Sequence, residues 1–141
     1  MSTISCTRKL EFDAAHRLRE HEGKCKNLHG HRYVVEASFS APKLDSLGRV
    51  VDFAIIKEKL GGWIDSNWDH TVILWERDRE LGEAIAAKTG QTIYYLPGNP
   101  TAENMAHYLF HDICPKLFAS LGITCSALRL HETNHCYVDV V

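Results

Sequence analysis

The chain has 141 residues, which fits one domain, and its formal net charge is −2. This charge excludes a broad basic surface for nucleic acid, and no apolar run reaches the roughly 18 residues of a membrane-spanning helix. The five cysteines are odd in number and form no C-x-x-C pair, so we expect free thiols in a soluble, cytoplasmic protein.

The first part of the chain predicts two strands joined by a polar loop. Apolar side chains alternate along residues 3–16 and again along residues 31–39, and this period of two is typical of half-buried strands. The polar loop between them, residues 17–27, is basic. Its cations could neutralise a phosphorylated substrate, although a solvated basic loop is the more common explanation of such a pattern. These cations are Arg17, Arg19, Lys24 and Lys26.

The middle of the chain shows helical periodicity. Asp52 is the expected N-cap of a helix whose apolar residues recur every three or four positions. Asp78 is expected to cap a shorter helix through Lys88, which Gly90 closes. This shorter helix lies within an otherwise irregular insert at residues 75–98.

The last third of the chain predicts a long helix followed by a hairpin. Thr101 should cap the helix, and Pro115 should kink or break it. Two strands, residues 124–133 and 136–141, come after it. The order strand, strand, helix, irregular insert, helix, strand, strand indicates one α+β domain over residues 1–141 with an antiparallel sheet.

Three histidines are candidates for a metal site. His29 and His31 are two residues apart and therefore lie on the same side of an extended strand, and His16 ends the apolar face of the preceding strand. Three neutral imidazoles with an open fourth position are typical of catalytic zinc, so we expect Zn²⁺ here. The H-x-H pattern alone is weak evidence, because two solvated histidines also produce it.

Cys25, four residues before His29, has three interpretations. As a fourth ligand it would close a structural Cys-His₃ zinc site. As a thiolate beside the metal it would move protons, since a nearby cation lowers the pKa of a thiol. As a buried thiol it would be inert. The residue pattern leaves these three interpretations open.

Two further sites carry carboxylates. Asp69 and His70 are adjacent, so we expect their side chains to diverge rather than pair directly, although a tight turn can aim both into a site. Glu132 shares its parity with Leu128 and Leu130, which predicts a carboxylate on the core-facing side of a strand. A buried carboxylate needs a partner, and a ligand with two adjacent N–H donors would provide one. The alternative is a glutamate at a strand end that reaches solvent.

Together these segments resemble the 6-pyruvoyl-tetrahydropterin synthase / 6-carboxytetrahydropterin synthase family. The resemblance implies the tunnelling fold (T-fold), with a four-stranded antiparallel sheet and two main helices. It also implies assembly into a barrel by trimers, usually paired as hexamers. The matching segments are Phe12-Asp13-Ala14-Ala15-His16, Cys25-x-x-x-His29-Gly30-His31, Val51-Asp52-Phe53, Asp69-His70, Pro100-Thr101-Ala102-Glu103-Asn104 and Glu132-Thr133.

The same resemblance implies a role for each candidate residue and a substrate, 7,8-dihydroneopterin triphosphate. Zinc would be bound by the three histidines, and a proton would be moved by a cysteine with an Asp-His relay. The pterin ring would be anchored by one glutamate and lined by residues at a helix N-terminus. The zinc ligands would be His16, His29 and His31, and the proton would be moved by Cys25 with Asp69 and His70. The anchor of the pterin would be Glu132, and the lining residues would be Thr101 and Glu103.

Three functions are compatible with these features. The first is 6-carboxytetrahydropterin synthase, a carbon–carbon lyase of the queuosine route that releases acetaldehyde. The second is 6-pyruvoyl-tetrahydropterin synthase, which eliminates triphosphate from the same substrate and keeps the side-chain carbons. The third, of another class, is a non-enzymatic module in which Cys25 closes a structural zinc site.

Overall fold

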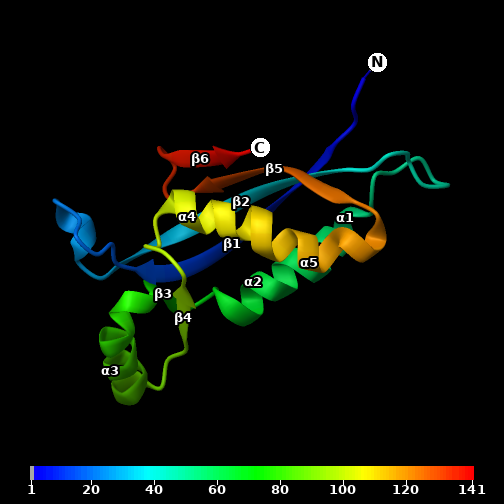
Figure 1. Cartoon of the computed structure of the whole chain (residues 1–141). Helices are drawn as coiled ribbons and strands as arrows, with labels where there is room; N and C mark the ends of the chain where they lie inside the picture. The colour runs from blue at the N-terminus through cyan, green and yellow to red at the C-terminus, as the bar shows by residue number, and fades with distance from the viewer. Residues whose placement is uncertain (1) are drawn as a thin grey trace.

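The computed structural model describes residues 2–141 and is built on one six-stranded sheet in the order β4-β3-β1-β2-β5-β6 (Figure 1). Four strands form its antiparallel part: β1 (Cys6–His16), β2 (His29–Ser40), β5 (Thr124–His131) and β6 (Tyr137–Val140). Two short strands, β3 (Thr71–Trp75) and β4 (Ile93–Leu96), continue the sheet in parallel beyond β1. The α+β class is therefore confirmed, and the expectation of four strands is corrected to six.

The helices cover one face of this sheet, and the core lies between them. Alternate side chains of β1 and β2, among them Phe12, Tyr33 and Val35, are almost fully buried, as the period-two pattern predicted. Figure 1 shows α1–α2 and α4–α5 running along the strands on the same side. The largest buried side chain is Trp68, which stacks with Tyr108 of α4.

The first helical run consists of α1 (Phe53–Ile56), a π-helical turn (Lys57–Gly61) and α2 (Gly62–Asn67). The predicted N-cap is confirmed, because a carboxylate oxygen of Asp52 accepts a 3.0 Å hydrogen bond from the backbone N–H of Ala54.

The second run consists of α4 (Ala102–Tyr108), a π-helical turn (Leu109–Ile113), α5 (Cys114–Phe118) and a final 3₁₀ turn (Ala119–Leu121). The predicted N-cap is confirmed here too, since Thr101 Oγ1 accepts a 3.0 Å hydrogen bond from the N–H of Asn104. Pro115 does not break the helix. It lies in the first turn of α5, where a missing N–H costs least, and the π turn immediately precedes it.

The insert contains α3 (Arg79–Thr89) between β3 and β4, and Gly90 ends this helix with a positive φ of 72° as expected. The predicted capping role of Asp78 is wrong. Its carboxylate makes no capping bond and instead accepts two hydrogen bonds from the guanidinium of Arg17, from Nε at 2.8 Å and Nη2 at 2.5 Å. Asp78 is only 2% exposed, and these hydrogen bonds hold its pKa below the usual value despite burial.

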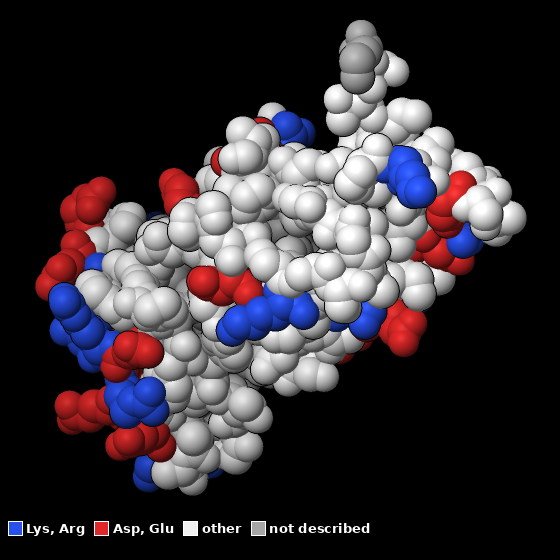
Figure 2. Space-filling model, turned by 45° about the vertical axis from the view of Figure 1, so that its right-hand side comes forward, with Lys and Arg blue, Asp and Glu red and all other residues white. Residues whose placement is uncertain are grey.

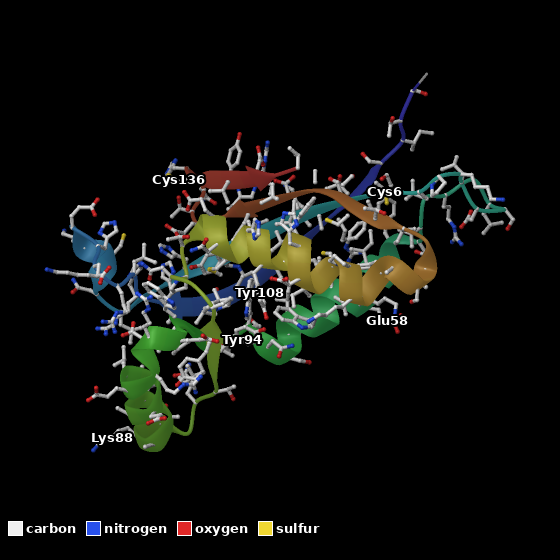
Figure 3. All side chains as sticks on the ribbon, in the orientation of Figure 1. Cys6, Glu58, Lys88, Tyr94, Tyr108 and Cys136 are labelled. Atoms are coloured by element: carbon white, nitrogen blue, oxygen red, sulfur yellow. The ribbon has the colours of Figure 1, made fainter. Side chains whose placement is uncertain are left out.

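The insert is also fastened to the second helical run. Tyr94 of β4 and Tyr108 of α4 point toward one another (Figure 3), and their hydroxyl oxygens are 2.6 Å apart. Burial raises the pKa of the Tyr94 phenol above its ordinary value. The insert is thus a packed extension of the sheet rather than a loose loop.

The surface carries both charges. On the face drawn in Figure 2, Lys and Arg side chains are interspersed with Asp and Glu side chains, and neither sign forms a continuous field. This agrees with the net charge of −2. Within residues 2–141, no helix combines the length and the apolar character needed to cross a membrane.

Candidate active site

The three candidate histidines come together where β1 ends and β2 begins. The antiparallel register places His16 directly opposite His29, and His31 lies two residues further along β2 on the same side. Their ring centroids are 4.7, 4.9 and 5.2 Å apart, and each pair of rings is steeply inclined. One potential ligand atom from each of the three rings lies within 4.8 Å of the others.

The hydrogen bonds of these rings leave their Nε2 atoms free for a common ligand. His16 Nδ1 lies 2.7 Å from the carbonyl oxygen of Pro100, and His29 Nδ1 lies 2.7 Å from that of Asn27. Each Nδ1 therefore carries the donated proton, which leaves the Nε2 lone pair unprotonated. The two Nε2 atoms then face one another at 3.1 Å without a proton between them, and His31 Nε2 is buried with no hydrogen-bond partner. A divalent cation would satisfy all three nitrogens, so the donor set fits zinc.

Burial favours the neutral form of two of these histidines. Burial first, and then the neighbouring His29 and His31, lower the pKa of His16 to about 4, although its hydrogen bond to the Pro100 carbonyl opposes the shift. The pKa of His31 is also lowered, mainly by burial, although Glu132 opposes the shift. Neutral imidazole is the form that binds metals, so the fold prepares these ligands for binding.

Four other predicted residues line a single cavity of about 470 Å³ beside the histidines. Cys25 reaches it from the 3₁₀ turn Lys24–Lys26, and Thr101 and Glu103 reach it from the start of α4. Glu132 reaches it from the β5–β6 hairpin. Cys136, which Figure 3 shows at the start of β6, lines the same cavity. Cys25 does not belong to the group of three histidines whose ligand atoms converge.

Glu132 borders both the cavity and the histidines. Leu128 and Leu130 are fully buried as their parity predicted, but the Glu132 side chain is 26% exposed because β5 ends one residue earlier. Its Oε1 lies 3.6 Å from His31 Nε2. The carboxylate therefore faces the site rather than the core, and it remains reachable by a ligand.

Asp69 and His70 pair directly, contrary to the expectation that adjacent side chains diverge. His70 Nδ1 lies 2.9 Å from Asp69 Oδ2 because His70 adopts a positive φ of 59°, which turns its side chain back. This backbone is clamped to β1, where the carbonyl of Asp13 accepts from His70 N–H at 2.6 Å and the N–H of Asp13 donates to Asp69 Oδ1 at 3.0 Å.

This pair lies on the other face of the sheet from the cavity that Cys25 lines. Asp13 alternates with the buried Phe12 and Ala14, and the side chain of Asp13 faces a second cavity of about 400 Å³. His70, Gln91 and also His31 line this second cavity, but Cys25 does not. The structure therefore brings Cys25 together with Glu132, Thr101 and Glu103, but not with the Asp69–His70 pair of the same chain.

The chain is similar to proteins that carry an enzyme name. The family model described as 6-pyruvoyl tetrahydropterin synthase matches residues 5–141. The chain belongs to the 6-pyruvoyl tetrahydropterin synthase family. A protein of Rickettsia conorii named 6-carboxy-5,6,7,8-tetrahydropterin synthase is 52% identical over 137 residues, covering 97% of this chain and 99% of the relative. A Haemophilus influenzae protein of the same name is 31% identical, covering 94% and 95%.

Two solved structures share the fold. An uncharacterized protein from Wolinella succinogenes superposes with a TM-score of 0.82 at 20% identity, covering 99% of this chain and 98% of that one. Caenorhabditis elegans 6-pyruvoyl tetrahydropterin synthase superposes with a TM-score of 0.70 at 24% identity, covering 99% and 96%. The T-fold expected from the sequence is thereby confirmed.

Two further residues position this site and were not predicted from the sequence. Asn99 binds Arg19 through both backbone groups, accepting from its N–H at 3.0 Å and donating to its carbonyl at 3.0 Å. Tyr33 lies below the histidines with its hydroxyl 3.2 Å from His16 Nδ1. The sequence signal for Asn99 is its place between Gly98 and Pro100, because an asparagine in a turn often uses its side-chain amide to bond backbone groups. Tyr33 gave no signal beyond its parity.

The Asp69–His70 contact predicts a measurable pKa change. Its hydrogen bond and charge raise the pKa of His70 above 6.5, because a carboxylate favours the imidazolium. We expect Asp69→Asn to lower the pKa of His70 toward 6.5, as read from an NMR titration of the ring protons. Asp65→Asn removes an exposed carboxylate that does not contact His70 and is the matched control. An unchanged pKa of His70 in Asp69→Asn would show that the pair does not exist in solution.

Proposed function

We propose that this chain is a zinc-dependent 6-carboxytetrahydropterin synthase of the cytoplasm, a carbon–carbon lyase of queuosine biosynthesis. It would convert 7,8-dihydroneopterin triphosphate and water to 6-carboxy-5,6,7,8-tetrahydropterin, acetaldehyde and triphosphate. The observation that carries this proposal is the 52% identity over nearly the full length of both chains to a relative of that name. The convergence of the three histidines beside a cavity lined by Cys25 and Glu132 supports it.

His16, His29 and His31 would hold the zinc ion through their Nε2 atoms. When bound, zinc would supply Lewis-acid polarisation of the oxygens of the substrate side chain. The carbonyls of Pro100 and Asn27 keep the His16 and His29 rings in the required tautomer, and such bonds also fix the ring orientation. The Nε2 atom of His31 lies 3.6 Å from Glu132 Oε1.

Cys25 would take and return the substrate proton, and the Asp69–His70 pair would exchange that proton with it. Since this pair lies on the opposite sheet face from the Cys25 cavity, one chain does not complete the relay. We therefore propose a homo-oligomer, a trimer or hexamer, in which His70 of one subunit reaches the Cys25 cavity of another. The sheet has edges at which another subunit could pair. β3 pairs with only residues 14–16 of β1, and β6 is the last strand at the other end of the sheet.

Glu132 would anchor the pterin. Its carboxylate would accept from the ring N–H and the neighbouring amino group, and each charge-assisted bond contributes roughly 1.5–3 kcal/mol. We expect Glu132→Gln to fold and bind zinc normally but to lose most of its affinity for a non-reactive pterin, because the amide would present a donor to a ligand donor. Isothermal titration with the pterin measures this. Glu58→Gln changes an exposed glutamate outside the cavity and is the control, and unchanged affinity in Glu132→Gln would remove the proposed anchor.

The competing reaction is that of 6-pyruvoyl tetrahydropterin synthase, whose name the matching family model carries. Incubation with 7,8-dihydroneopterin triphosphate separates the two proposals. Acetaldehyde together with a 6-carboxy product supports the lyase, whereas a 6-pyruvoyl product without acetaldehyde supports the alternative. The third function, a structural Cys-His₃ module, predicts neither product and requires Cys25 as a ligand.

A further inference from the structure

The loop that carries Cys25 is fastened at its base. The N–H of Leu18 donates to the carbonyl of Cys25 at 2.9 Å, which closes the loop on itself. Asn99 holds Arg19 through two backbone hydrogen bonds and in turn accepts from Asn104 Nδ2 at 2.9 Å, next to the start of α4. The residues at the tip of the loop are therefore held against the cavity.

Two of the four cations in this loop are already engaged. Arg17 makes a bidentate contact with the buried Asp78, and Arg19 Nη1 donates to the carbonyl of Arg77 at 2.8 Å and approaches Asp78 at 3.3 Å. The hydrogen bonds that Arg17 donates to Asp78 raise the pKa of Arg17 above its already high value. Moving Arg17 onto an anion would take the bidentate partner away from the buried Asp78, which is costly, and moving Arg19 would break its hydrogen bond to the Arg77 carbonyl.

His21, at the tip of the same loop, has a donor aimed by its local structure. The backbone N–H of Gly23 donates to His21 Nδ1 at 2.8 Å, so Nδ1 is the acceptor and the ring proton lies on Nε2. The ring is seated on Gly23, where an added Cβ would come within 3.2 Å of His21 Cε1. His21 lines the cavity with Cys25, and among its lining residues it is the one whose side chain offers an N–H.

The charges around the cavity differ from one side to the other. Glu132, at the histidine end, and Glu103, at the start of α4, contribute carboxylates that would repel an anion. The loop carries both signs: Lys24 and Lys26 flank Cys25, Glu20 and Glu22 flank His21, and all four side chains are exposed. Among the described residues, only the loop side of the cavity offers ammonium groups and an imidazole N–H as well as carboxylates, so an elongated ligand with one neutral, donor-rich end and one anionic end would place its anionic end toward these donors.

We propose that His21 recognises the phosphate chain of the substrate, donating its Nε2–H to a phosphate oxygen. Arg17 and Arg19 do not contact the phosphates but hold the loop in place through Asp78. This inference rests on the proposed function, since it takes the anionic end of the ligand to be a triphosphate.

Two substitutions at position 21 separate this role from a structural one. His21→Asn keeps an acceptor where Nδ1 now bonds Gly23 N–H but removes the donor at the Nε2 position. His21→Gln keeps a donor near the Nε2 position. The zinc-loaded protein is titrated with inorganic triphosphate and, separately, with neopterin, which carries the pterin and side chain without phosphate.

We expect His21→Asn to weaken inorganic triphosphate binding about tenfold or more, as for one lost hydrogen bond to a charged group, with neopterin affinity unchanged. His21→Gln should stay within about threefold of the unsubstituted protein for both probes. Triphosphate affinity that is unchanged in His21→Asn, while neopterin still binds, would overturn the His21 proposal and leave the proposed function intact. Triphosphate binding that depends on His21 in a protein that does not bind neopterin would support His21 but contradict the pterin assignment. An equal loss for both probes would assign His21 a structural role and overturn the proposal.

Discussion

Replacing His29 and His31 together by alanine is expected to leave less than about 0.1 zinc per chain and no detectable turnover. One imidazole remains in that variant, and His16 alone cannot hold a divalent ion against competition from water and buffer. The unsubstituted protein should carry one zinc per chain, and zinc added to the metal-free form should raise its melting temperature by linkage, an effect absent from the double variant. Metal analysis of the purified protein and thermal unfolding measure the two effects.

The chain offers a matched control for this double substitution. His107 and His111 on the second helical run are both exposed, and their rings are 4.1 Å apart. His107→Ala/His111→Ala removes the same number of imidazoles away from the site and should keep zinc and turnover. Stoichiometric zinc in His29→Ala/His31→Ala would show that the metal is bound at another site.

Mixing two inactive variants should restore activity if the proton relay spans subunits. Cys25→Ala and His70→Ala are each expected to retain zinc and lose turnover, since each removes one member of the relay. In an oligomer reassembled from equal amounts of both, some sites combine the intact Cys25 of one subunit with the intact His70 of another. Random assortment gives about a quarter of the wild-type activity per site.

The control for mixing is a pair whose defects lie in the same half of the site. Cys25→Ala mixed with His29→Ala/His31→Ala leaves no site intact, because Cys25 and the histidines belong to the same subunit. That mixture should stay inactive after identical treatment, and sedimentation should confirm that mixed oligomers have formed. Failure of the first mixture to recover activity, with mixed oligomers present, would contradict a relay shared between subunits.

The sheet face on which the three histidines lie could be predicted from sequence, because strand periodicity determines it. Once residues 3–16 and 31–39 alternate, the side of the sheet that His16 and His31 occupy follows from parity. The caps at Asp52 and Thr101 were also predictable, because capping depends on residues within one turn. The convergence of the histidines additionally required the pairing register of β1 with β2, which single-strand patterns do not specify.

The errors arose where distant contacts override local preference. Residues 71–74 are buried on both faces and therefore show no alternation, so β3 could not be distinguished from irregular structure. Asp78 precedes a helix as a cap would, but the guanidinium of Arg17, 61 residues away, is its stronger partner. The Asp69–His70 contact depends on a positive φ that β1 imposes through Asp13, which a dipeptide does not reveal.

The buried contact between Arg17 and Asp78 has a consequence for exchanging parts between relatives. The loop with Cys25 and the insert with α3 are far apart in sequence but share one carboxylate, so they form a single transplantable unit. A chimera that receives the loop without the insert would expose two unpaired guanidinium groups beside the cavity that Cys25 lines. A chimera that receives the insert alone would bury a lone carboxylate. Recombination libraries built from this family should therefore move the two segments together or substitute both partners at once.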